Sequence, residues 1–258
     1  MAFLLSVGSL ICKAQVSVQL APPLLKYESI FFKNSTNVEL KFAQQGAQIY
    51  YTVNSNPPTQ NDKLYSKPVQ ITKTFTTLKA IAARTGFLPS EMVSATFIKD
   101  GLKIQSVQHT AANERFRGSG INTLIDNEGG ITNMNAGTWV GFQQDSVEVD
   151  IRLVHSQKIA AVVLNFLLDP GSWIFLPAQI HIFYFDDSRQ SFQLMTDQVI
   201  VPDKQINGPI CQPVKLDAVK KIITEKVKII LTGIRSLPEW HPGKGQHGWI
   251  FIDEIKVY

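Results

Sequence analysis

The sequence predicts an all-β protein built of two tandem β-sandwich modules. Helical periodicity is almost absent along the 258 residues, and short runs rich in β-branched and aromatic residues follow one another instead. Turn residues such as Gly, Pro, Asn and Asp separate these runs at a spacing typical of antiparallel sandwiches. The chain is 44% hydrophobic and 18% charged, so it has enough apolar material for packed cores and is not expected to be disordered.

The first half carries at least four predicted strands. Residues 38–42 alternate between apolar and polar side chains, and the other three runs are 49–53, 77–82 and 93–97. The polar turn Lys99-Asp100-Gly101 is the best candidate for a boundary between modules. We therefore expect a first module over residues 17–100 and a second over residues 101–258.

The second half repeats the pattern with longer strands. Residues 147–152 alternate as a half-exposed strand does. Residues 158–168 are apolar after Lys158 apart from Asn165, which predicts a strand buried on both faces. Residues 179–185 and 191–194 predict a hairpin across Asp186-Asp187-Ser188. Further strands are expected at 226–234 and 249–258, and residues 217–224 could form a short helix. The loop at 235–248, rich in Pro, Gly, Trp and His, is long enough to suggest a functional or closely packed segment.

The amino terminus resembles a secretory signal peptide. Residues 2–11 are apolar and too short to span a bilayer, and Ala14 is a small residue after which a signal peptidase could cut. No Lys or Arg precedes the run, so either the true start lies upstream or the segment has another role. Cleavage after Ala14 would make residues 1–14 a signal peptide and would leave Cys211 as a lone, inert thiol. We expect a secreted, periplasmic or cell-surface protein.

Charge and hydropathy exclude two classes of partner. The formal net charge is +4, and basic and acidic residues alternate along most segments, so no nucleic-acid-binding patch is predicted. Residues 160–168, apolar apart from Asn165, end at Asp169-Pro170, so the segment has the length of a strand and is too short for a membrane span.

Two motifs in the first half carry a resemblance to a known family. The hairpin sequence IYYTVNSNPPT at residues 49–59 and the strand TLKAIA at 77–82 resemble the Ig-like module found C-terminal to bacterial chitobiase and β-hexosaminidase catalytic domains. The resemblance covers residues 20 to 98 and implies an Ig-like sandwich.

The second half resembles the discoidin-type (coagulation factor 5/8 C) jelly roll, a galactose-binding-like fold. The segments that carry this resemblance are LID at 124–126, TWVGF at 138–142, DPGSWIFLP at 169–177 and PEWHPGKG at 238–245, running into WIFIDE at 249–254. Together the two resemblances imply the accessory region of a hexosaminidase-like enzyme.

The catalytic part of such an enzyme has no counterpart in this sequence. A (β/α)8 barrel needs roughly 250 residues of alternating strand and helix. The single Asp-Glu pair, Asp253-Glu254, lies in a predicted strand, where adjacent side chains should point to opposite faces and could not act together. We therefore expect no enzymatic activity.

The discoidin-type resemblance implies a structural Ca²⁺ site. By position, Asp126 in a glycine-bearing acidic loop and Glu254 near the carboxyl end would be its side-chain ligands, since calcium prefers oxygen donors. The alternative is that Asp126 caps a turn and Glu254 flanks a strand.

Carbohydrate binding is the second candidate function of this half. A sugar is held by an aromatic face and a few polar groups, and five loop residues could supply both: Trp173, Phe175, Trp240, His241 and His247. Trp139 and Trp249 have strand-like neighbours and are expected in the core. The favoured hypothesis is a secreted, non-catalytic protein that binds a glycan, containing N-acetylhexosamine or galactose, through the jelly-roll loops. The rival is a scaffold, such as a separated tail that associates with a glycoside hydrolase and binds no sugar.

Overall fold

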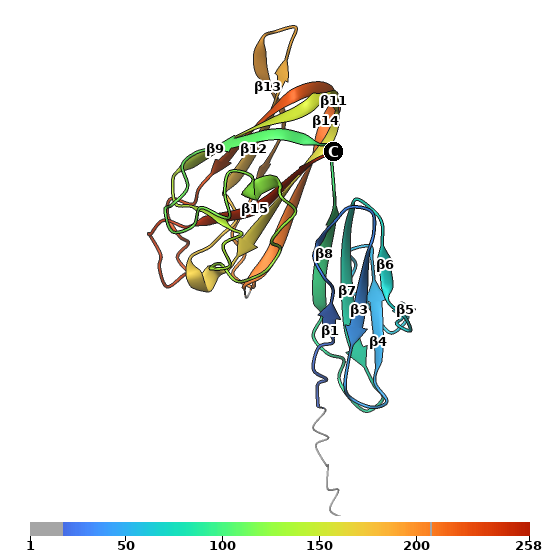
Figure 1. The fold of residues 1–258 in the computed structure, drawn as a ribbon. Helices are drawn as coiled ribbons and strands as arrows, with labels where there is room; N and C mark the ends of the chain where they lie inside the picture. Colours follow the sequence, from blue (N-terminus) through green and yellow to red (C-terminus); the bar gives the residue numbers. More distant parts are fainter. Residues whose placement is uncertain (1–17, 207) are drawn as a thin grey trace, which may run out of the picture.

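The computed structural model describes residues 18–206 and 208–258, so the predicted signal peptide at residues 1–14 lies outside the described part. Fifteen strands and two 3₁₀ turns make up the regular structure, and no α-helix occurs among the described residues (Figure 1). The all-β prediction is confirmed. None of the described residues forms a helix long and apolar enough to cross a membrane.

Residues 24–99 form two sheets that share one core. One sheet has the order β1-β3-β6, and the other has the order β2-β8-β7-β4-β5. Their strands are β1 (Leu24–Lys26), β2 (Phe31–Phe32), β3 (Thr36–Lys41), β4 (Gln48–Thr52), β5 (Lys63–Leu64), β6 (Val69–Ile71), β7 (Phe75–Ala83) and β8 (Val93–Lys99). Val38 of β3 and Leu78 of β7 are fully buried in the same hydrophobic cluster, so the two sheets pack face to face.

Residues 104–257 form a single seven-stranded sheet that curls into a second sandwich. Its order is β10-β15-β11-β14-β12-β13, with β9 also paired to β11. The strands are β9 (Ile104–His109), β10 (Val140–Phe142), β11 (Ser146–Leu168), β12 (Gln179–Asp186), β13 (Ser191–Val199), β14 (Ile210–Thr232) and β15 (Ile250–Val257).

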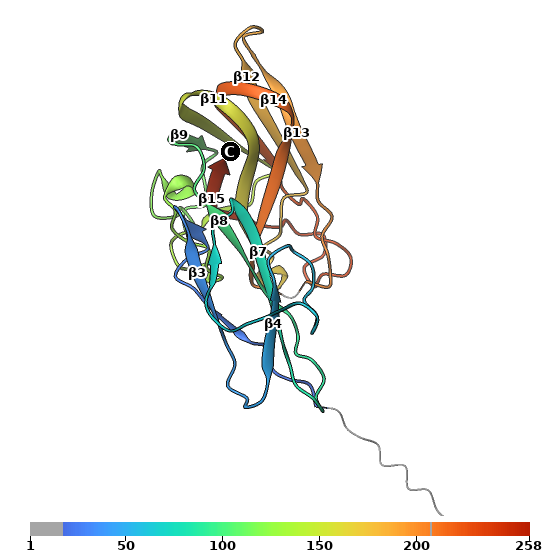
Figure 2. The same cartoon turned by 90° about the vertical axis from the view of Figure 1, so that its right-hand side faces the viewer.

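The long strands β11 and β14 belong to both layers of this sandwich. The first part of β11 pairs with β9, its last part pairs with β15, and β14 accompanies it along both parts. Register shifts between Arg152 and Gln157 and between Ile159 and Ala161 mark where the ribbon bends (Figure 2). The fold thus joins two strands, predicted separately at 147–152 and 158–168, into one.

The apolar side chains of both layers meet in one core, which includes Val149, Leu164, Ile182 and Ile229. Residues 161–168 are buried without interruption, so the prediction of a strand covered on both faces holds for this part, whereas Lys158 and Ala160 are exposed. Val163 points away from this core and joins the hydrophobic cluster of the first half. The second face of β11 is therefore covered in part by the preceding sheets.

The prediction of a short helix at residues 217–224 is wrong, because these residues belong to β14. Asp217 pairs with Ala161 and Ile222 with Ile159 across the ladder to β11. The buried positions Leu216, Ile222 and Thr224 face inward while Val219 and Ile223 remain exposed. Pairing with β11 thus decides the conformation of a segment whose apolar pattern is ambiguous on its own.

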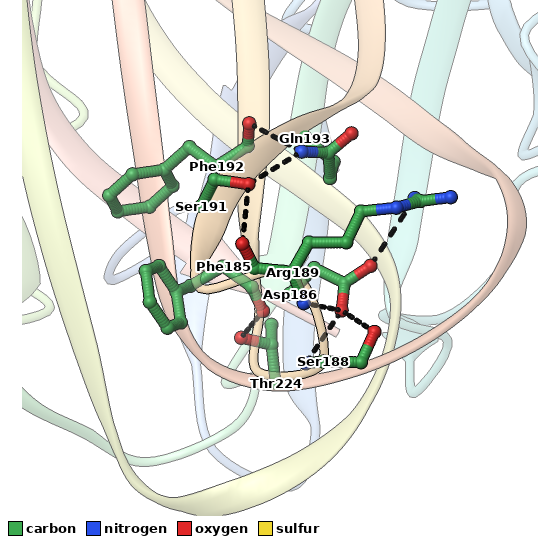
Figure 3. A network of polar contacts seen from close by, with 8 residues as sticks. All are labelled: Phe185, Asp186, Ser188, Arg189, Ser191, Phe192, Gln193 and Thr224. Carbon is green, nitrogen blue, oxygen red and sulfur yellow. Dashed lines mark hydrogen bonds and ion pairs between the residues drawn. The ribbon is translucent and has the colours of Figure 1, made fainter.

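The predicted hairpin across residues 186–188 is present between β12 and β13 (Figure 3). The Asp186 carboxylate accepts hydrogen bonds from the Ser188 amide at 2.9 Å and from the Ser188 hydroxyl at 2.6 Å. These bonds to the charged form, chiefly the one from the Ser188 hydroxyl, lower the pKa of Asp186. The Phe185 and Phe192 rings pack edge to face at 5.4 Å beside the turn.

The two halves meet around the end of β8 and the carboxyl end of the chain (Figure 1). The Leu102 amide donates to the Val257 carbonyl at 2.7 Å, and the Tyr258 hydroxyl donates to the Lys99 carbonyl. Gly130 lies against Ile30, and a Cβ atom at Gly130 would come within 2.3 Å of that side chain. Both polar and apolar contacts therefore join the first sheets to the second sandwich.

Candidate functional site

The candidate site lies where two loops of the second sandwich meet. The first loop contains a 3₁₀ turn, η2 (Pro170–Ser172), and the second joins β14 to β15. A bridge between Ile174 and Trp249 holds the loops together. The Trp249 amide donates to the Trp173 carbonyl at 2.8 Å, and the Phe175 amide donates to the Trp249 carbonyl at 2.9 Å. Main-chain bonds thus fix the aromatic side chains that these loops carry.

Trp173 ends the 3₁₀ turn in the left-handed region, with φ of 60°. Its amide donates to the Pro170 carbonyl at 3.0 Å, which closes the turn. Its indole lies directly over Gly243, where an added Cβ atom would come within 1.8 Å of the indole Nε1. Only glycine at 243 is therefore compatible with this position of the Trp173 ring.

His241 is buried between these loops and organises the rings around it. Its Nε2 lies 2.8 Å from the Pro170 carbonyl, and its Nδ1 accepts the Gly243 amide at 3.0 Å. Nε2 therefore carries the proton that it donates to Pro170. The His241 ring lies 5.9 Å from the Trp173 ring and 5.8 Å from the Trp240 ring.

Phe175 packs against the His241 and Trp240 rings and is itself a core residue. It is 2% exposed, and its ring lies 5.4 Å from His241 and 6.2 Å from Trp240. Trp173 is 38% exposed and Trp240 is 39% exposed. We call Trp173 and Trp240, with His241 and Phe175 beneath them, the aromatic rim. Four of the five predicted sugar-binding residues are thus brought together, and two of the four present a face to solvent.

The fifth predicted residue, His247, lies apart from the aromatic rim contacts. Its Nδ1 faces Asp145 Oδ1 at 3.7 Å, and Arg235 Nε contacts the other oxygen of the same carboxylate at 3.1 Å. His247 is therefore not part of the cluster around His241, although the two residues are close in sequence.

Trp249, expected in the core, instead lines a hollow beside the aromatic rim. It is half-buried, and its ring packs against Phe116 at 5.6 Å and Phe251 at 5.9 Å. Arg115 lies over the Phe116 ring at 5.2 Å, and Ser172 completes the wall next to Trp173. Trp249 immediately precedes β15, where the loop ends and the strand begins. This position in the sequence could have indicated that Trp249 is only partly buried.

Trp139 is 1% exposed, as predicted for a core residue. It packs with Leu167, Ile174 and Phe251, and its indole N–H donates to the Ile131 carbonyl at 3.0 Å. This cluster forms the floor under the hollow.

The predicted calcium ligands Asp126 and Glu254 already have protein partners. Asp126 Oδ1 accepts the Glu128 amide at 2.9 Å, and its Oδ2 accepts the Ser119 hydroxyl at 3.1 Å. Glu254 is 1% exposed, and its Oε2 accepts the Asn127 amide at 2.8 Å. Asp126 thus acts as a turn-forming residue in this arrangement.

The ammonium group of Lys256 faces Glu254. Lys256 Nζ lies 2.9 Å from Glu254 Oε1 and also contacts the Asn127 side-chain oxygen. No group of three or more His, Cys, Asp or Glu residues suited to a metal ion occurs in the described ranges. From these contacts we expect no Ca²⁺ ion held jointly by Asp126 and Glu254.

Asp253 and Glu254 both contact the loop at 127–130, contrary to the expectation that they point to opposite faces. Asp253 Oδ2 accepts the Gly130 amide at 2.6 Å and its Oδ1 accepts the Asn165 side-chain amide at 2.8 Å. The reason is a register shift, because Asn165 pairs with Glu254 and Phe166 pairs with Ile252, which leaves Asp253 as a bulge.

Burial dominates the protonation of these two carboxyl groups. It raises the pKa of Asp253 to about 8 although the Gly130 and Asn165 donors favour the charged form. Burial also raises the pKa of Glu254, to about 7, against the opposing charge of Lys256. Burial likewise raises the pKa of the Cys211 thiol to about 12, in agreement with an inert thiol.

Comparison with known proteins finds a family match within the first half. Residues 28–95 match the family model described as the chitobiase/beta-hexosaminidase C-terminal domain, which is about a quarter of the chain. This confirms the predicted resemblance over that segment. No curated protein matches the chain.

Several solved structures are similar at low identity. A GH29 fucosidase from Ruminococcus gnavus, in complex with fucose, is 14% identical with a TM-score of 0.38; the match covers 59% of this chain and 24% of the fucosidase. A pectin-binding carbohydrate-binding module is 16% identical with a TM-score of 0.39, over 60% of this chain and 91% of the module. The family 32 carbohydrate-binding module of Streptococcus pneumoniae EndoD is 14% identical with a TM-score of 0.39, over 62% of this chain and 96% of the module. This chain therefore matches less than a quarter of the length of that fucosidase.

Proposed function

We propose that this protein is a secreted, non-catalytic accessory protein that binds a glycan at the loop end of its second sandwich. The aromatic rim and the adjacent Trp249 hollow would form the binding surface. Trp173 and Trp240 would stack on the sugar ring, and Arg115 and Ser172 would bond its hydroxyl groups.

The observation that carries this proposal is the fixed exposure of two tryptophans on adjoining loops. Indole faces that stay 38% and 39% exposed leave apolar surface in water, and large exposed aromatic rings gathered at one place commonly mark binding surfaces. Both rings are held by contacts with buried His241, so little side-chain entropy would be lost when a sugar stacks on them.

The polar groups beside these rings suit a neutral sugar. Arg115 offers a planar set of donors, and the Ser172 hydroxyl can both donate and accept. Residues of N-acetylhexosamine or galactose present the mixture of C–H faces and hydroxyl groups that such a surface would bind. We therefore infer a glycan that contains one of these sugars.

The buried state of the Asp-Glu pair supports a non-catalytic role. Asp253 and Glu254 are 0% and 1% exposed, and each carboxylate is bound by the loop at 127–130. A general acid must reach the substrate within hydrogen-bond distance, and neither group can do so here. The family match of residues 28–95 supports the further inference that the chain serves a glycoside hydrolase as an accessory region.

A glycan array probed with the purified full chain tests this proposal. We expect binding to glycans that contain terminal galactose or N-acetylhexosamine, and loss of that binding in a Trp173→Ala/Trp240→Ala variant. Lack of binding to any glycan would favour the rival role, a scaffold that associates with a hydrolase and binds no sugar.

A further inference from the structure

A groove along the free edge of the first sandwich carries a positive charge. It lies between β5 and β6, which Figure 1 places on the same side of the module. Lys63, Lys67 and Lys73 line it, and all three are exposed. Within the described part of the chain, no Asp or Glu is among its lining residues. An anionic ligand would therefore meet attraction and no local repulsion.

One residue that lines the groove, Thr76, carries a buried hydroxyl without a partner among the described residues. Thr76 is 5% exposed and lines the groove, and its Oγ1 has no hydrogen-bond partner within the described residues. A buried polar group left unpaired destabilises a fold by roughly 1–3 kcal/mol, so the Thr76 hydroxyl calls for a partner that the described part of the chain does not supply. Tyr51 and Val53 supply apolar surface next to it.

The walls of the groove are strand edges with free main-chain groups. β6 pairs with β3 and β5 pairs with β4, and the described ladders give each of them a partner on one side only. An unpaired edge presents a row of N–H and C=O groups that another extended chain can bond. A polysaccharide lacks the regularly spaced amides needed to complete such a ladder.

We propose that this groove binds an extended acidic peptide segment of a partner protein, added as a strand to the edge of β6. Glutamate or aspartate side chains pair with the three lysines, and a polar group of the segment bonds the Thr76 hydroxyl. This inference concerns the first module alone and is independent of glycan binding by the second.

Edge lysines also protect proteins from unwanted strand pairing. That role would account for the three charges, but it gives no reason for the unpaired hydroxyl of Thr76. The two explanations differ in whether a peptide binds, which is what the experiment measures.

The test is fluorescence polarisation of the full chain with a short labelled peptide of alternating Glu and Thr. We expect saturable binding that weakens with added salt, because exposed charges are screened. The same peptide with alternate N-methylated amides should not bind, since it cannot pair with β6. A peptide of alternating Lys and Thr should not bind either.

Two variants of the protein locate the site. Reversal of Lys63, Lys67 and Lys73 to Glu should weaken binding about tenfold, as expected from the loss of three exposed ion pairs. Reversal of the exposed Lys103, Lys204 and Lys221 is the control with the same net charge, and it should leave binding unchanged. Thr76→Val should weaken binding while the melting temperature is equal or higher, because the unpaired hydroxyl is removed.

Equal binding of the N-methylated peptide would overturn strand addition. If reversal of the three control lysines weakened peptide binding as much as reversal of Lys63, Lys67 and Lys73, the proposed site would be wrong. Failure of the peptide with binding of polygalacturonate would show that an acidic polysaccharide is the ligand, and failure of both would leave the lysines as edge protection.

Discussion

Lys256 Nζ lies 3.2 Å from Asp100 Oδ1 and so ties the last strand to the segment that joins the two halves. The same ammonium lies 2.9 Å from Glu254 Oε1, and its side chain is 8% exposed. The Phe31 ring of the first half lies 6.0 Å away from it. One buried cation therefore balances two carboxylates and contacts both halves.

Replacement of this cation should destabilise the protein strongly. Lys256→Met leaves Glu254 buried without its partner, and loss of one member of a buried ion pair costs about 3–5 kcal/mol. We expect a large fall in the free energy of unfolding by chemical denaturation. Lys215→Met, which removes an ion pair with Asp217 whose carboxylate side chain is 69% exposed, should cost about 1 kcal/mol or less.

The double variant Lys256→Met/Glu254→Gln provides the control for this reading. It removes both charges and should recover part of the stability lost in Lys256→Met. Equal losses in Lys256→Met and Lys215→Met would contradict the central position of Lys256.

Stability should fall as the pH rises from about 4 to about 8. The folded pKa of Asp253 is about 8, above the ordinary carboxyl value near 4, so the folded chain binds this proton more tightly than the unfolded chain does. The stabilising contribution is complete below about pH 4 and is lost as the pH approaches about 8. Its full size is on the order of 5 kcal/mol, and Glu254, with a pKa of about 7, acts in the same direction.

Thermal melts at about pH 5 and about pH 8.5 measure this effect. The melting temperature should be higher at the lower pH, and Asp253→Asn, which cannot ionise, should reduce the difference. A melting temperature that rises with pH over this range would show that Asp253 is not protonated in the folded state.

Calcium should have little effect on stability. An ion that binds only the folded state raises its stability by about 2.7 kcal/mol at a hundredfold excess over Kd. Because Lys256 faces Glu254 and the Asp126 oxygens bind Ser119 and Glu128, we expect equal melting temperatures in calcium and in chelator. A lower melting temperature in chelator that disappears in Asp126→Ala would instead support the calcium site implied by the resemblance.

Separation of the chain at Lys99-Asp100-Gly101 tests its modularity. We propose that residues 17–100 and 101–258 fold independently, because each half has its own hydrophobic cluster. Val163 and Lys256 would lose their partners across the junction, so the second fragment should melt cooperatively but at a lower temperature than the full chain. A soluble second fragment without a cooperative transition would contradict the proposed boundary.

The fold was largely predictable because its signals are local. Alternation in β3 and turn chemistry at Asp186 appear directly in the sequence, and both are present in the structure. The continuity of β11 and the strand conformation of residues 217–224 were missed, because they depend on pairing between segments far apart in the chain. Bends made by register shifts likewise leave no local pattern.

The sequence predicted which residues form the candidate site, but not which of their side chains are exposed to solvent. Aromatic and histidine residues on two loops indicated the aromatic rim, yet His241 and Phe175 turned out to be buried supports. Which ring faces solvent depends on Gly243 beneath Trp173 and on the bridge to Trp249, neither of which is visible in a sequence. Lys256 was missed as well, because its two carboxylate partners come from different segments.

Parallel measurement of glycan retention and melting temperature for Trp240→Ala and Trp173→Ala tests the proposed binding surface most directly. Phe192→Ala is the matched control, since Phe192 is 37% exposed on β13, outside the aromatic rim, and Trp139→Ala is the core control. We expect each rim variant to lose about 1–3 kcal/mol of glycan binding with little change in melting temperature, whereas Trp139→Ala should destabilise the fold by roughly 3–5 kcal/mol. Retention of both rim variants equal to that of the wild type, or a fall in their melting temperatures as large as that of Trp139→Ala, would contradict the proposed function.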